Sequence, residues 1–86
     1  MGIESVMGNL VEGWARATEM DNAMLAAGYG TNPYSDIAAC IAEAIYHMIG
    51  DEGDYENSAT SYILNSDDMN QEERVADLIS CYNKRR

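Results

Sequence analysis

The sequence is poor in basic residues, and this shortage dominates its charge. Only five of 86 residues are Lys or Arg, against fifteen Asp or Glu, so the formal net charge is −10. Three of the five bases are the last three residues, Lys84, Arg85 and Arg86. Residues 1–83 therefore carry fifteen acids and two bases, a net charge of −13. With so few counter-charges, most of the negative charge is expected to stay unpaired, which disfavours direct binding to nucleic acid and to anionic lipid.

Other absences limit the chemistry and the cellular location. The chain has one histidine, His47, and two cysteines, Cys40 and Cys81, without a surrounding catalytic motif, so we expect neither an enzyme nor a bound cofactor. No apolar run approaches the ~20 residues that span a bilayer. The first thirteen residues lack a basic start and an unbroken apolar run, which predicts no secretory leader. We therefore expect a cytoplasmic protein with reduced thiols and no membrane association.

The apolar content indicates a folded domain despite the acidity. Hydrophobic residues make up 47% of the chain, which is ordinary for a globular protein and high for a disordered acidic tail. The length suits one domain over residues 1–86. We predict an all-α, single-domain bundle of three to four helices whose surface carries the acids.

Helical spacing and capping residues give the expected elements. A long apolar stripe predicts a first helix to about Ala27, and Asn32 followed by Pro33 predicts a second helix that ends at Gly50. The second helix has Ala-rich flanks, so we expect it to lie centrally. Asn70 and Glu73 match a capping box for a last helix to about Asn83, where the C-terminal bases would suit the negative helix end. Residues 55–64 fit a helix, with a short strand over residues 60–64 as the alternative.

One stripe of residues has the side chains of a metal site. Asp36, Cys40, Glu43 and His47 follow one another at helical spacing, but one ion needs further ligands from another helix or a second protomer. A polar helix face with a packed Cys is the favoured alternative, so we predict no metal. Residues 51–62 do not match a calcium loop, because Gly53 and Tyr55 occupy ligand positions.

The strongest functional signal is a run of acids without a base. Residues 51–73 contain eight carboxylates and no Lys or Arg. Six of the seven aromatic residues in the chain are tyrosines, which suit polar protein interfaces. The predicted partner-binding residues are Asp51, Glu52, Asp54, Tyr55, Glu56, Tyr62, Asp67 and Asp68. If residues 55–64 form a helix, the two acidic clusters lie at its ends, about 15 Å apart; they form either one anionic surface or two unrelated solvated turns.

Three functions are compatible with this pattern. The preferred hypothesis is a protein-binding module that inhibits a nucleic-acid-handling complex by occupying its basic surface. Its general profile is similar to that of small acidic inhibitors encoded by phages and mobile elements, including anti-CRISPR proteins and DNA mimics. The first alternative is a homo-oligomeric or antitoxin-like module, with a Met-rich first helix at the interface of a homodimer. The minor alternative is a carrier protein or a metal-binding helical protein. The chain resembles acyl carrier proteins in size, acidity and probable helix count, but Ser35 precedes Asp36 where that family has Asp before Ser, which removes the attachment site.

Overall fold

Four helices make up the fold of residues 2–85. The computed structural model describes residues 2–85, and in this range it contains no strand. The helices are α1 (Ile3–Ala26), α2 (Pro33–Ile49), α3 (Ala59–Leu64) and α4 (Gln71–Lys84). The all-α prediction is confirmed, and the segment with strand-like composition is helical.

The predicted capping signals determine where α2 and α4 begin. The Asn32 side chain accepts hydrogen bonds from the backbone amides of Tyr34 and Ser35, and Pro33 occupies a first-turn position where no amide donor is needed. The capping box of Asn70 and Glu73 is present in both directions. These local hydrogen bonds explain why the sequence predicted both starts correctly.

The third helix is shorter than predicted. It begins at Ala59 instead of Tyr55, because the Ser58 side chain accepts a hydrogen bond from the amide of Ser61 and caps the helix there. Six residues are too few for a helix that is stable in isolation. Packing of its buried Ile63 and Leu64 against the core supplies the missing stability.

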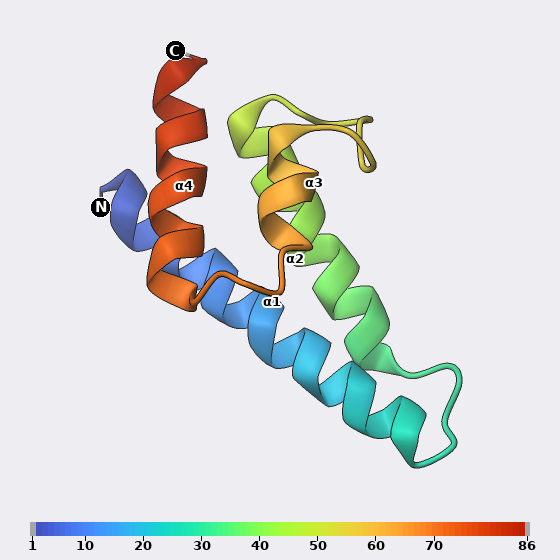
Figure 1. Ribbon diagram of the computed structural model, residues 1–86. Coiled ribbons are helices and arrows are strands. Elements are labelled where there is room, and N and C mark those ends of the chain that lie inside the picture. The colour runs from blue at the N-terminus through green and yellow to red at the C-terminus, as the bar shows by residue number, and fades with distance from the viewer. Residues whose placement is uncertain (1, 86) are drawn as a thin grey trace.

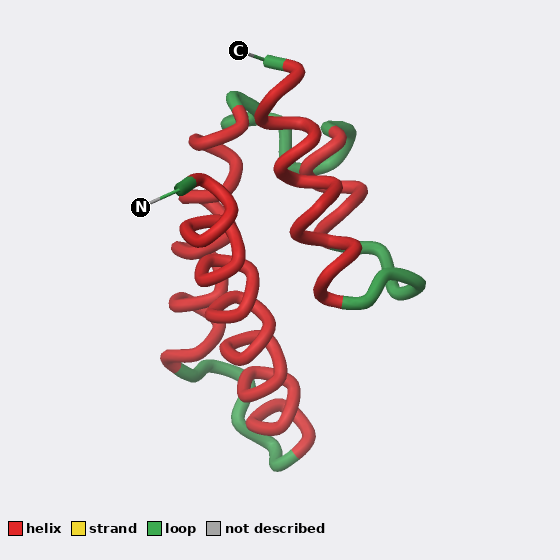
Figure 2. The backbone as a smooth tube through the Cα atoms, turned by 90° about the vertical axis from the view of Figure 1, so that its left-hand side faces the viewer, coloured by secondary structure: helices red, strands yellow, loops and turns green. Residues whose placement is uncertain are grey.

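The long helices α1 and α2 form an antiparallel hairpin, and the two shorter helices cover only one end of it (Figure 1). A view turned by 90° shows the same arrangement, with the other end of the hairpin extending beyond the rest of the molecule (Figure 2). The molecule is accordingly elongated, at 43 × 25 × 24 Å. A Cβ on Gly13 would lie 3.3 Å from Ile41 Cδ1, so this glycine allows α1 and α2 to approach closely.

The core lies at the covered end of the hairpin. Its fully buried members include Met7 and Val11 from α1, Ile45 from α2 and Leu78 from α4. The helix α2 contacts the other three helices, which agrees with its predicted central position. Between residues 18 and 44, by contrast, only Asn32 is buried. The uncovered half of the hairpin is therefore held mainly by contacts between α1 and α2.

None of the helices described in residues 2–85 is long and apolar enough to cross a membrane.

Candidate protein-binding site

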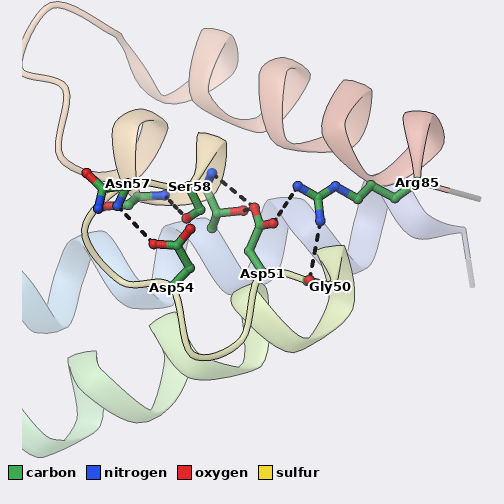
Figure 3. Close-up of polar contacts among 8 residues, drawn as sticks. Gly50, Asp51, Asp54, Asn57, Ser58 and Arg85 are labelled. Atoms are coloured by element: carbon green, nitrogen blue, oxygen red, sulfur yellow. Dashed lines mark hydrogen bonds and ion pairs between the residues drawn. The ribbon is translucent and has the colours of Figure 1, made fainter.

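The first acid of the predicted surface is a structural residue. The Asp51 side chain is buried, at 5% exposure. Its Oδ2 accepts a hydrogen bond of 2.7 Å from Thr60 Oγ1, and its Oδ1 forms a 2.7 Å ion pair with Arg85 (Figure 3). Asp51 thus joins the start of α3 to the end of α4. It does not present its carboxylate to a partner, which corrects the prediction that placed it on the binding surface.

Two of the bases act on the ends of other helices. Arg85 also donates to the carbonyl of Gly50, at the negative end of α2. This differs from the expectation that the C-terminal bases serve the end of their own helix. Arg74 donates to the carbonyls of Ile63 and Leu64 in the last turn of α3, and its guanidinium lies 5.4 Å from the centre of the Trp14 ring.

This use of the bases leaves the acidic surface unneutralised. Within residues 2–85 there are two ion pairs, Arg16 with Glu12 and Arg85 with Asp51. Subtracting these two acids from the fifteen of the sequence leaves thirteen carboxylates without an ion pair in the described part of the chain. In the two acidic segments beside α3, only Asp51 has an ion pair within residues 2–85.

Four of the predicted residues meet around one hollow. Glu56, Tyr62, Asp67 and Asp68 line a surface hollow of about 430 Å³, together with Ser61, Asn65 and Ser66. All four are exposed, and Tyr62 is 76% exposed. The two acidic clusters therefore converge in part, because α3 spans only about 9 Å at the helical rise. We refer to this feature as the acidic hollow.

The remaining predicted residues belong to the loop between α2 and α3. Glu52 is exposed, and Asp54 accepts a hydrogen bond from the amide of Asn57, which stabilises the turn (Figure 3). Tyr55 leans towards α2, where its hydroxyl donates a 3.1 Å hydrogen bond to Glu43. This bond to a carboxylate raises the pKa of Tyr55.

Glu43 was not among the predicted binding residues, although it belonged to the stripe considered for a metal. In the described part of the chain, no three His, Cys, Asp or Glu side chains lie together in a way that could hold an ion. The hydroxyl of Ser35, the residue compared with the carrier attachment site, donates a 2.9 Å hydrogen bond to Asp21. Glu43 could have been found only through its helical stripe with Asp36, and no local sequence feature connects this stripe with Tyr55.

Comparisons of the chain with protein-family models, curated proteins and solved structures found no match.

Proposed function

We propose that the protein binds a basic protein surface through the acidic hollow, and that it thereby inhibits a nucleic-acid-handling complex in the cytoplasm. The observation that supports this most is the grouping of Glu56, Asp67 and Asp68 around an aromatic side chain that is 76% exposed. Binding would be steric and electrostatic, in the manner of a DNA mimic or an anti-CRISPR-like inhibitor, with no chemical step.

The charge and the aromatic ring have complementary roles in such an interface. None of the three carboxylates of the hollow has an ion pair within residues 2–85, so their field extends into solvent and would accelerate encounter with a basic surface. A tyrosine supplies a large contact area and loses little conformational freedom when it is buried. Tyr62 is therefore the expected anchor, and the acids around it provide selectivity for a basic partner.

The test is affinity capture from the native host at low salt, followed by identification of the protein that elutes as salt rises. The affinity of the purified partner is then measured for the wild type and for the double variant Asp67→Asn, Asp68→Asn. We expect the variant to bind about tenfold more weakly, and wild-type binding to weaken as ionic strength rises. Tyr62→Ala should weaken binding by a similar factor because it removes the anchor.

The matched control is the double variant Glu4→Gln, Glu19→Gln, which changes the net charge equally at two exposed positions outside the hollow. If the control weakened binding as much as the hollow variant, net charge alone would account for it. An affinity that did not depend on salt, or an empty eluate, would contradict the proposed function and favour a simple solvated surface.

The uncovered end of the hairpin favours self-association as a second candidate function. Four large apolar side chains there are more than 40% exposed: Met20, Leu25, Tyr29 and Ile37. In a homodimer, a second copy would bury them. Analytical ultracentrifugation should then show a dimer that Leu25→Glu dissociates and Asp67→Asn does not; a monomer at high protein concentration would exclude this function.

A further inference from the structure

A second hollow follows one side of α2 and is bordered by the loop that leads to α3. Its volume is about 570 Å³, and its lining residues are Asp36, Ala39, Cys40, Ala42, Glu43, Tyr46 and Tyr55. We call this feature the α2 groove. It shares no lining residue with the acidic hollow.

The sequence of α2 creates the floor of this groove. Residues 36, 39, 40 and 43 lie on one face of a helix, because neighbours three and four positions apart are adjacent there. The middle of this face carries small side chains, and a carboxylate stands at each end, separated by about 10 Å along the helix axis. The result is a shallow apolar channel with an anionic group at either end.

The wall of the groove is an aromatic ring held in place by two contacts. The Tyr55 ring lies edge-on to Tyr46, with 4.8 Å between the ring centroids and 75° between the planes. Tyr46 is buried, at 5% exposure, and so provides a fixed support. The hydrogen bond from Tyr55 to Glu43 Oε1 holds the other end of the ring. Tyr55 nevertheless remains 46% exposed, so it can contact a ligand.

Charge complementarity indicates the ligand. Neither Asp36 nor Glu43 forms an ion pair with a base among residues 2–85, and only one oxygen of Glu43 is used by Tyr55. A carboxylate beside an exposed aromatic ring suits a planar guanidinium, which can bond the acid and stack on the ring. An ammonium group is more strongly hydrated and suits this combination less well.

We propose that the α2 groove binds an arginine side chain of the partner protein. The aliphatic stem lies on Ala39 and Ala42, and the guanidinium contacts Glu43 and the Tyr55 ring. The inference rests on the proposed function in that it assigns a basic protein as partner, but it concerns a different site. It explains how an acidic protein could select arginine-rich surfaces over lysine-rich ones.

The test is an NMR titration of the full chain at low ionic strength with three capped tripeptides, glycine-arginine-glycine and its lysine and citrulline counterparts. Citrulline has the shape of arginine without its charge. We expect the arginine peptide to shift the amide signals of residues 36–43 and the side-chain signals of Tyr55. The lysine peptide should bind more weakly, and the citrulline peptide should not bind.

Variants test whether arginine binding depends on the groove residues or only on the overall negative charge of the protein. Glu43→Gln and Tyr55→Leu should each weaken arginine binding about threefold to fivefold, since each removes one of the two contacts with the guanidinium. Glu52→Gln is the matched control, because it removes one exposed carboxylate of the neighbouring loop outside the groove. Equal weakening by Glu52→Gln, shifts spread over all the acidic segments, or equal binding of citrulline would overturn the inference, as would an absence of shifts.

The same titration distinguishes failure of the groove from failure of the proposed function. The double variant Asp67→Asn, Asp68→Asn should bind the arginine peptide as the wild type does. If it loses affinity for the captured partner while the wild-type groove binds no arginine, only the groove is disproved. If the groove binds arginine and no basic partner is found, only the proposed function fails.

Discussion

The two acidic segments beside α3 have similar compositions, but the fold uses the acids of the first much more than those of the second. In the loop before the helix, Asp51 is buried and bonded to Thr60 and Arg85, and Asp54 holds a turn. In the connector after the helix, Asp67 and Asp68 are exposed and have no ion pair in the described part of the chain. Asp51 and Asp54 thus stabilise the fold, whereas Glu56 of the first segment joins Asp67 and Asp68 of the second around the acidic hollow.

The position of the arginines causes this difference. Arg85 forms an ion pair with the Asp51 carboxylate in the first segment. Arg74 instead donates hydrogen bonds to backbone carbonyls of the second segment, including those of Ser66 and Met69. A base that bonds a carbonyl orders the chain without neutralising the neighbouring acids. The connector is therefore both ordered and anionic, which is favourable for a binding surface because less entropy is lost on association.

Removal of the buried acid should produce the largest effect. We expect Asp51→Ala to lower the free energy of unfolding by about 3 kcal/mol, because it leaves the fully buried Thr60 and the Arg85 guanidinium without their partner. Urea denaturation followed by circular dichroism measures the change. Glu52→Ala, the neighbouring exposed acid, is the control and should change stability by less than about 0.5 kcal/mol. Equal effects of the two variants would remove the distinction between structural and free acids.

Loss of the arginine that orders the connector should have the next largest effect. Arg74→Met keeps much of the apolar stem but removes hydrogen bonds to four carbonyls and the contact with Trp14. We expect a loss of about 2 kcal/mol. Hydrogen exchange should accelerate in α3 and in residues 65–70 more than in α2. A uniform change over all four helices would show that Arg74 does not act locally.

Neutralisation of the exposed acids should scarcely alter stability. Asp67→Asn with Asp68→Asn should change the free energy of unfolding by less than about 0.5 kcal/mol, because neither side chain has an ion pair within residues 2–85. The same denaturation experiment measures it beside Asp51→Ala. A loss as large as that of Asp51→Ala would show that the connector acids also belong to the fold.

The smallest expected effect is on the ionisation of one tyrosine. The hydrogen bond to Glu43 is the main cause of the raised pKa of Tyr55, with desolvation and the charge of Glu43 contributing further. Glu43→Gln should therefore lower that pKa towards its ordinary value. NMR titration of the tyrosine ring signals measures it, with Glu52→Gln as control. An unchanged pKa in Glu43→Gln would contradict the contact that forms the wall of the α2 groove.

Features encoded by neighbouring residues could be predicted from the sequence. Asn32 with Pro33 and Asn70 with Glu73 mark the helix starts, because a cap bonds amides two or three residues away. The start of α3 was predicted four residues too early. There the cap of Ser58 outweighed the apolar spacing that suggested a helix from Tyr55.

The candidate site could be predicted only in part, because its residues come together across the chain. Nothing in the local sequence separates Asp51 from Glu52; the difference is Arg85, which lies more than thirty residues away. Glu43 and Tyr55 are likewise neighbours only because the loop between α2 and α3 folds back on α2. Glu56 and Asp67 line one hollow only because α3 is short.

The sequence by itself determined the helical class, most helix ends and the excess of negative charge, since these depend on composition and on interactions within a few residues. The tertiary structure decided which acids are free. Only folding brings Arg74 to the end of α3 and Arg85 to the end of α2 and to Asp51. The acids around Tyr62 are left without an ion pair within residues 2–85. The physical reason is that each of these arginines bonds groups supplied by other elements, so neighbouring residues cannot reveal which acids it neutralises.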